Sequence, residues 1–499
     1  MNIIVKSLLT ILLPVALFTP AKADKLVILH TNDTHSQIDP NDKNLGGVLR
    51  RKVVIDSVKA NNRNTLVVDA GDAVQGTMFF NLYGGEVEYK MLDLLGYDMA
   101  IVGNHDFDNG SEALAKLLAK SNTRWLSTNY DLKGGPLENI FEPYAIYEFD
   151  GKKIGFIGLN LRPHGMIADG NYNGVEYLDG IKAANSTAWH LRHNEKADMV
   201  IAISHLGYSG KPAPKDIDIA SQSEDIDIII GGHSHSYINP ADSAKAYVKN
   251  AVGKPVLIAQ VGKQGMNVGQ ITIDLDDLSH NYSTITVDSR LDDRTSPDLA
   301  AILVPYRAGV DSLMQIKVAE SAGNFENSEP ALINFVSDFA FEMGRKLNNG
   351  KPVDLAFMNK GSLRRSLPKG DVTLGMIMMM QPFNNYFEVI DVKGKDLLDA
   401  FDVMAMRGGD GVSANVEAVM KDRKCTSVKI DGKKIDPNKT YRLITIDYLA
   451  NGGDYMESLI SAPKIARSKQ VVYKDLLEYL KTDMKGQKIN PSNVRRMHQ

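Results

Sequence analysis

The chain has 499 residues, of which 43% are hydrophobic and 24% charged, proportions typical of a globular protein with two or three domains. Its formal net charge of −4 shows no excess of basic residues, so we expect no polymeric nucleic acid as a partner. The one cysteine, Cys425, excludes an intrachain disulfide and a cysteine metal site, and we interpret it as structural or incidental.

The first predicted element is a signal peptide over residues 1–23. Lys6 precedes an apolar stretch over residues 7–18, which is short and is interrupted by Pro14. Residues 21–23, Ala-Lys-Ala, fit a small-x-small cleavage site, so the mature chain is expected to begin at Asp24 and to retain no integral membrane segment. We therefore expect an exported protein, periplasmic or secreted, and the alternative interpretation is an N-terminal anchor.

Short apolar runs then alternate with segments of helical length up to about residue 275. The helical segments include residues 85–96 and 111–120. The runs lie at residues 26–29, 66–68, 100–102, 154–159, 199–203, 226–230 and 256–259. Continuous apolar runs favour strands buried on both faces, and their alternation with helices predicts an α/β layered domain over residues 24–290.

A charged, proline-containing stretch over residues 286–298 separates this domain from the rest of the chain. A helix is predicted near residues 298–316, and we interpret residues 291–324 as a linker and hinge helix. The second, smaller domain is expected over residues 325–499. It combines a helical pattern at 331–347 with strand patterns at 387–394 and 441–446, which indicates an α+β fold.

Five predicted strands of the first domain end in polar side chains. They lead into HTNDTH at 30–35, DAGD at 69–72, GNHDFD at 103–108, SH at 204–205 and GGHSH at 231–235. Ligands bind outside the carboxyl ends of strands in open α/β sheets, so these side chains are expected to converge. A simple turn would explain one such segment, but five segments with oxygen and imidazole donors indicate a metal site.

Seven of these side chains form the predicted ligand set: Asp33, His35, Asp72, Asn104, His205, His233 and His235. That number suits two divalent cations if one carboxylate bridges them, and the donor types suit zinc, manganese or similar ions. Two such cations and two carboxylates leave a net positive site that would attract a phosphate dianion. His105 and Asp108 are left for acid–base or electrostatic roles.

These motifs resemble those of the calcineurin-like metallophosphoesterases. More narrowly, ILHTNDTH at 28–35, VDAGDAVQGT at 68–77 and GNHDFDNG at 103–110 resemble the 5′-nucleotidase family. The resemblance implies a four-layer α/β/β/α domain and His105 with Asp108 as the catalytic dyad. It also implies that Asp72 bridges the two metals, with Asp33, His35 and His235 around one of them and Asn104, His205 and His233 around the other.

The second domain carries three further motifs of this family. They are NKGSLR at 359–364, QPFNN at 381–385 and YLANGGD at 448–454. The resemblance implies a nucleoside pocket in which Phe383 and Tyr448 stack on the base, Asp454 binds the ribose, and Asn359 and Arg364 contact the substrate. Two rings can sandwich any base, and a carboxylate can accept hydrogen bonds from ribose hydroxyls. Core packing is the alternative role of the two aromatic side chains.

The chain departs from the family in the second domain. Tyr448 stands where phenylalanine is common, Glu326 occupies the region in which many relatives carry a substrate-binding arginine, and the first motif has lost glycines. These departures leave the preferred substrate open.

The predicted reaction releases phosphate from a nucleoside 5′-monophosphate by in-line attack of a metal-activated water. The alternatives are a UDP-sugar hydrolase or 2′,3′-cyclic-nucleotide phosphodiesterase with the same metals, a thiosulfate-type hydrolase, and a non-catalytic nucleotide-binding protein. The intact ligands and dyad disfavour the last of these, and the second-domain motifs disfavour the thiosulfate enzyme. In the family the two domains rotate, so the helix near 298–316 is the expected hinge.

Overall fold

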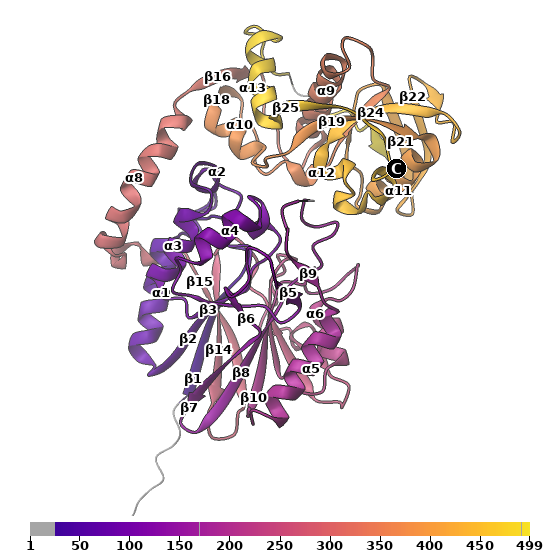
Figure 1. The fold of residues 1–499 in the computed structure, drawn as a ribbon. Coiled ribbons are helices and arrows are strands. Elements are labelled where there is room, and N and C mark those ends of the chain that lie inside the picture. The colour runs from indigo at the N-terminus through magenta and orange to yellow at the C-terminus, as the bar shows by residue number, and fades with distance from the viewer. Residues whose placement is uncertain (1–24, 169, 491) are drawn as a thin grey trace, which may run out of the picture.

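The computed structural model describes residues 25–168, 170–490 and 492–499, and the chain forms two lobes bridged along one side by the long helix α8 (Figure 1). The predicted signal peptide and the start of the mature chain at Asp24 lie outside the described residues. Among the described helices, none is long and apolar enough to cross a membrane.

The first lobe contains two large sheets. The seven-stranded sheet has the order β15 (His280–Thr286), β14 (Asn267–Asp274), β1 (Lys25–Thr31), β2 (Asn64–Asp69), β3 (Met99–Ala100), β4 (Arg124–Leu126), β6 (Phe141–Glu142). The six-stranded sheet has the order β12 (Tyr247–Lys249), β13 (Pro255–Ala259), β11 (Ile228–Gly231), β10 (Met199–Ser204), β8 (Lys152–Leu159), β7 (Tyr144–Phe149). A small ribbon pairs β5 (Tyr130–Asp131) with β9 (Glu176–Tyr177).

Alternate residues of the buried strands face different layers. On β1, Ile28 lies in a core with Ile201 of β10, whereas its neighbour Leu29 lies in a core with Ile55 of helix α1. Residues of β10 that face away from the first sheet form a third core with helix α5. The predicted α/β/β/α layers are therefore confirmed (Figure 1). The helices of this lobe are α1 (Val48–Asn61), α2 (Met78–Tyr83), α3 (Glu86–Leu95), α4 (Ser111–Leu118), α5 (Gly180–His193), α6 (Asp216–Gln222) and α7 (Ser243–Ala246).

The second lobe is the expected mixture of helices and sheets around one core. Its main sheet has the order β20 (Gly411–Val412), β17 (Leu355–Met358), β24 (Thr440–Ile446), β19 (Tyr386–Lys393), β25 (Lys464–Val471). A second sheet contains β23 (Lys433–Lys434), β22 (Lys424–Ile430), β21 (Val416–Lys421) and β26 (Met497–His498), and β16 (Lys317–Ser321) pairs with β18 (Gly370–Thr373). Its helices are α9 (Pro330–Leu347), α10 (Leu374–Met380), α11 (Gly394–Met406), α12 (Asp447–Ala450) and α13 (Val472–Thr482).

Cys425 lies half-buried on β22 and packs against the core of the second lobe. Burial raises the pKa of its thiol to about 11, so the thiolate is scarce at neutral pH. Both observations favour the interpretation of this cysteine as a structural residue.

Helix α8 (Pro297–Met314) connects the lobes. Ser296 caps it by accepting a hydrogen bond from the backbone N–H of Leu299, and Pro297 occupies the first turn, where a missing N–H costs nothing. The helix is held on the first lobe by Arg307, whose Nη2 lies 2.5 Å from Oδ1 of Asp39. The limits of the predicted linker at residues 291 and 324 stay a prediction.

Two predicted strands are shorter than expected. The strand expected at 100–102 is β3, which ends at Ala100 because the chain turns away into the 3-10 helix η1 (His105–Phe107). The strand expected at 226–230 is β11, which begins at Ile228; Asp227 precedes it and accepts a hydrogen bond from the backbone N–H of Val200 through its side chain.

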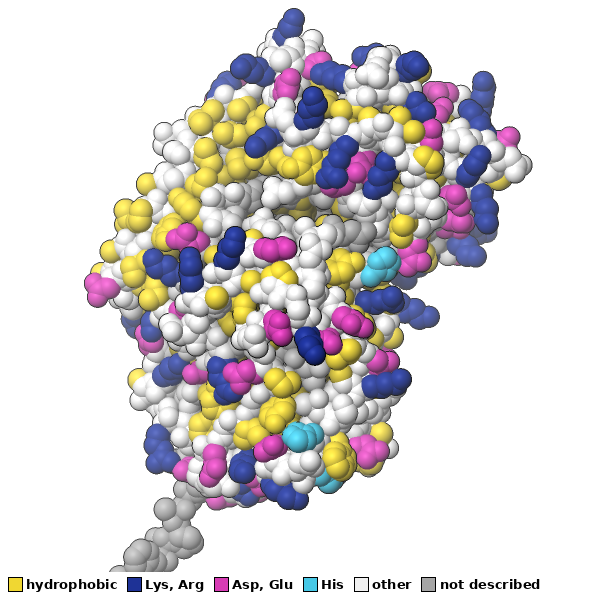
Figure 2. Space-filling view, viewed as in Figure 1, with side chains coloured by type: hydrophobic (Ala, Val, Ile, Leu, Met, Phe, Trp, Pro, Cys, Tyr) yellow, Lys and Arg dark blue, Asp and Glu magenta, His cyan; other side chains and the backbone are white. Residues whose placement is uncertain are grey.

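Charged side chains of both signs are interspersed over the face of the molecule drawn in Figure 2. Lys and Arg lie beside Asp and Glu on both lobes, so this face carries no continuous basic patch (Figure 2).

Candidate active site

The polar ends of strands β1, β2, β3, β10 and β11 meet at one edge of the first lobe. The seven predicted ligand side chains lie there, although they come from two different sheets and span residues 33–235. Six of them form two groups that could each hold a metal ion. The first is Asp33, His35 and His235, and the second is Asp72, His205 and His233.

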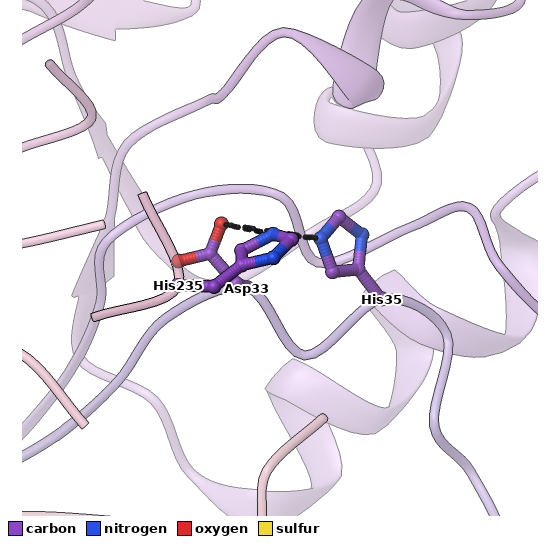
Figure 3. A group of neighbouring side chains, drawn as sticks. All are labelled: Asp33, His35 and His235. Atoms are coloured by element: carbon purple, nitrogen blue, oxygen red, sulfur yellow. Dashed lines mark hydrogen bonds and ion pairs between the residues drawn. The ribbon is translucent and has the colours of Figure 1, made fainter. Parts of the chain in front are cut away.

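The first group directs its donor atoms at a common point (Figure 3). Nε2 of His35 lies 2.8 Å from Nε2 of His235, and the latter atom lies 3.5 Å from Oδ1 of Asp33. Burial holds the pKa of His35 well below its usual range and lowers that of His235 to about 3, so both imidazoles are neutral. Neutral imidazoles with converging Nε2 atoms are suited to bind a metal ion.

In the second group, the orientation of His205 is fixed by the backbone. Its Nδ1–H donates to the carbonyl of Ala70 at 2.6 Å, so Nε2 is the ring nitrogen that faces the other side chains of the group. This Nε2 is fully buried, and no described residue forms a hydrogen bond with it. It lies 3.2 Å from Oδ2 of Asp72. A buried imidazole nitrogen aimed at a carboxylate in this way fits a metal ion between them.

The two groups adjoin one another, and Asn104 lies beside the second group. Nε2 of His205 lies 3.9 Å from Oδ1 of Asp33, which belongs to the first group. Oδ1 of Asn104 lies 3.0 Å from Nδ1 of His233. The structure thus brings all seven predicted ligands together, and the assignment of each ligand to one ion stays a proposal.

Several of these residues have a strained backbone conformation. Asp33, His35, Asp72, His233 and His235 all have positive φ angles, between 47° and 69°. Each such residue costs about 1–3 kcal/mol, and strain of this kind clusters at functional sites. The neighbouring glycine at 103 is required by space, because a β-carbon there would clash with Oδ1 of Asp72 and Nε2 of His205.

The buried carboxylates of the site are balanced by histidines. Burial acts to raise the pKa of Asp72, but the charges of His205 and His105 lower it by more, so the group stays ionised. Burial likewise acts to lower the pKa of His205, but Asp72 raises it to about 10. A divalent cation would take the place of the proton on His205, because a metal-ligating imidazole is neutral.

His105, the first residue of η1, and Asp108, which follows η1 at its C-terminal cap, form the predicted pair. Nδ1 of His105 lies 3.1 Å from Oδ2 of Asp108, so the carboxylate accepts the Nδ1–H and orients the ring. On the other side of the ring, Nε2 accepts a hydrogen bond at 3.2 Å from Nη2 of Arg364, which belongs to the second lobe. The pKa of His105 is raised, since Asp108 and Asp72 outweigh the lowering effect of burial.

Sequence reasoning missed Asp106, which lies between the two residues of this pair. Its Oδ2 accepts hydrogen bonds from the backbone N–H groups of Asp72 and Gly103, and its Oδ1 accepts one from the hydroxyl of Tyr89. Asp106 therefore positions the loops that carry Asp72 and His105. The GNHD motif contained the signal, because it places a further carboxylate next to a ligand loop, and the structure buries that side chain.

A cavity of about 560 Å³ lies between the two lobes beside the metal groups. Asp72, Asn104, His105, Asp108, His233 and His235 line one side of it. All five predicted nucleoside-pocket residues also line it, namely Asn359, Arg364, Phe383, Tyr448 and Asp454. Asp33, His35 and His205 lie behind this surface and are buried.

The residues of the second lobe are connected by hydrogen bonds. The carboxylate of Asp454 accepts one from Nδ2 of Asn359 at 2.7 Å and one from the hydroxyl of Tyr448 at 3.1 Å. The guanidinium of Arg364 lies 5.1 Å from the centre of the Phe383 ring. Glu326 does not line the cavity; its carboxylate accepts a hydrogen bond from Ser366 instead.

Comparisons with known proteins agree with this architecture. Residues 26–237 match the family model of the calcineurin-like phosphoesterases, and the fold and site therefore define a hydrolase of that class. Residues 312–460 match the model of the 5′-nucleotidase C-terminal domain. With both domains present in this order, the chain belongs to the 5′-nucleotidase family.

Similar proteins match over almost their full length. The chain is 28% identical to the 5′-nucleotidase of Vibrio cholerae serotype O1 over 513 residues, which covers 93% of this chain and 91% of the relative. It is 29% identical to the apyrase of Tabanus yao over 510 residues, with 91% of each covered. The crystal structure of a 5′-nucleotidase precursor from Thermus thermophilus superposes with a TM-score of 0.81 at 27% identity, covering 95% of this chain and 99% of that one.

Proposed function

We propose that this chain is an exported phosphohydrolase with two divalent metal ions, which releases phosphate from nucleoside 5′-monophosphates. One observation carries the proposal. A single cavity is lined by the candidate metal ligands and acid–base pair of the first lobe and by the side chains of the second lobe that are predicted to stack on the base and bind the ribose. The family membership and the names of the relatives support it, and the N-terminal sequence supports export, to the periplasm or outside the cell.

In the proposed mechanism the first lobe binds the phosphate and provides the groups that hydrolyse its ester bond. The seven ligands named above would hold the ions, zinc, manganese or similar, and bound ions would supply an activated water and charge stabilisation. His105 lies at the edge of the cavity, where the Nε2–H of its imidazolium form can donate to a phosphate oxygen or protonate the leaving ribose oxygen. Asp108 holds the ring in the required tautomer through Nδ1.

Arg364 links the two halves of the proposed site. Its guanidinium contacts both Nε2 of His105 and the ring of Phe383, which are proposed to act on the phosphate and on the nucleoside respectively. Arginine presents planar donors that suit phosphate oxygens. We infer that a bound phosphate accepts the hydrogen bond that Nε2 of His105 now accepts from Arg364, so that Nε2 can carry the proton that it donates in the reaction.

The same metal groups would also serve a UDP-sugar hydrolase or a 2′,3′-cyclic-nucleotide phosphodiesterase. A non-catalytic nucleotide-binding protein is the remote alternative.

The test measures phosphate release by purified protein that begins at residue 24. AMP, UDP-glucose, 2′,3′-cyclic AMP and ribose 5-phosphate are compared with manganese or zinc and with EDTA. Release that EDTA abolishes and that favours AMP is expected. Equal rates on AMP and ribose 5-phosphate would contradict the nucleoside pocket, and no release with either metal would support the binding-protein alternative.

Tyr448 provides a separate test of the nucleoside pocket. Base stacking on one ring contributes about 1–3 kcal/mol, so Tyr448→Ala is expected to raise the KM for AMP by about five- to 150-fold. Tyr448→Phe retains the ring and releases Asp454 from the hydroxyl of Tyr448. It is expected to keep a KM close to that of the unaltered protein.

Steady-state kinetics on AMP and thermal melting of both variants decide between the two roles of Tyr448. If Tyr448→Ala lowered only the melting temperature, core packing would be its role.

A further inference from the structure

The side chain of Arg467 lines the cavity, but it belongs neither to the proposed metal centre nor to the predicted pair of stacking rings. It lies on β25 in the second lobe, and its guanidinium carbon is 4.5 Å from the centre of the Tyr386 ring. Its Nη2 donates to Oδ2 of Asp447 at 2.8 Å. Since half of the side chain is exposed, at 52%, a ligand in the cavity can reach it.

The position of Arg467 is tied directly to the proposed base-stacking residue. The other oxygen of Asp447 accepts hydrogen bonds from the backbone N–H groups of Tyr448 at 2.9 Å and Tyr386 at 3.1 Å. It also accepts one from Nδ2 of Asn385 at 3.2 Å. Asp447 thus links the Arg467 guanidinium to the backbone of Tyr448, the proposed base-stacking residue, and both side chains line the same cavity.

The charge of Arg467 is already balanced. Nη1 lies 3.5 Å from Oε1 of the buried Glu388, and Nζ of Lys464 lies 3.1 Å from the other oxygen of that carboxylate. Two cations therefore face two carboxylates, Glu388 and Asp447. A balanced cluster has little attraction for a second phosphate group, but its uncommitted N–H donors can still bond to a neutral acceptor.

We propose that Arg467 is a specificity residue that reads the edge of the nucleobase and favours 6-oxopurines over adenine. Among the described residues, Asp447 accepts a hydrogen bond from one of the five N–H donors of the guanidinium. Guanine and hypoxanthine present two acceptors, O6 and N7, which match a two-donor guanidinium edge. Adenine presents an amino group at the same position, and this donor cannot bond to a side chain that carries only donors.

This inference rests on the proposed nucleotidase function. It concerns the base alone, because IMP and AMP share the same ribose and phosphate. The ratio of their kcat/KM values therefore cancels any change in the metal centre or in the amount of folded protein.

The experiment measures kcat/KM for IMP, AMP and ribose 5-phosphate with full-length mature protein. A matched pair of groups that bond well to one base discriminates by about tenfold or more, so the unaltered protein is expected to prefer IMP by this factor. In Arg467→Ala the IMP-to-AMP ratio is expected to fall to about one. Arg467→Lys keeps the charge opposite Asp447 but loses the planar pair of donors, so its ratio is expected to fall as well.

Lys464→Ala is the matched control, because Lys464 lies on the same strand and bonds to the same Glu388 but does not line the cavity. Its IMP-to-AMP ratio is expected to equal that of the unaltered protein. A ratio that stays the same in Arg467→Ala would overturn the proposal and leave Arg467 as a structural ion pair. If both nucleotides react no faster than ribose 5-phosphate, the nucleotidase function itself fails; if both react faster but equally, only the base preference fails.

Discussion

His105→Asn is expected to lower kcat by about 10²–10⁴-fold, the usual contribution of a positioned acid–base group, and to leave the metal content unchanged. The side chain of His105 lies in neither metal group. Its backbone N–H donates to Oδ1 of Asp72, and an asparagine retains that N–H. The variant thus separates the chemistry of the imidazole from metal binding.

Kinetics on AMP and elemental analysis of the same His105→Asn sample measure the two effects. Asp108→Asn is the companion variant: it keeps a hydrogen-bonding side chain near Nδ1 but removes the charge, and a smaller loss of kcat is expected. Unchanged turnover in His105→Asn would remove His105 from the mechanism. Loss of metal in that variant would instead assign the residue a structural role.

Asp72→Asn is expected to lower both metal occupancy and activity, the latter by about 10³-fold or more. Asp72 is the proposed bridge, and Nε2 of His205 lies 3.2 Å from its Oδ2. Asparagine keeps the shape but removes the negative charge that two cations would share. Metal ions stabilise the charge of the transition state by several kcal/mol. Each decrease of about 1.4 kcal/mol in activation free energy raises the rate tenfold.

The increase in melting temperature on adding manganese measures metal binding independently of activity. A ligand that binds only the folded state raises the melting temperature, so the unaltered protein should show a larger shift than Asp72→Asn. Asp56→Asn is the matched control, since this exposed carboxylate on α1 pairs with Lys52 and lies outside both metal groups. Equal shifts in Asp72→Asn and in the unaltered protein would contradict the bridging assignment.

The buried strands were predictable because each is a run of apolar residues with both faces covered. Ile28 and Leu29 are adjacent in the sequence and face different cores, and a continuous apolar run is the pattern that such a strand requires. Strand ends were less predictable. Ala100 ends β3 although Ile101 and Val102 remain buried, because the loop at Gly103 turns toward Asp106 through a hydrogen bond that spans three residues.

The sequence predicted the donor side chains of the candidate site, but it predicted fewer of the residues that position them. The polar side chains after each strand indicated metal chemistry, because a simple turn would explain one such strand end but not five with oxygen and imidazole donors. The GNHD motif signalled a further carboxylate at Asp106 but not its partners, and the roles of Asp447 and Arg467 were not predictable. Each depends on contacts made by folding, such as the bond between Arg467 and Asp447, 20 residues apart.

The sequence by itself determined which chemical groups are present: seven oxygen and imidazole donors, the His105–Asp108 pair three residues apart, and aromatic side chains in the second domain. These are local properties, set by residue type and short spacing. Only the tertiary structure decided which groups face one another. His35 meets His235, 200 positions away, and Arg364 reaches His105 across 259 positions, because the packing of two sheets and the closure of two lobes bring distant strand ends and loops to one cavity.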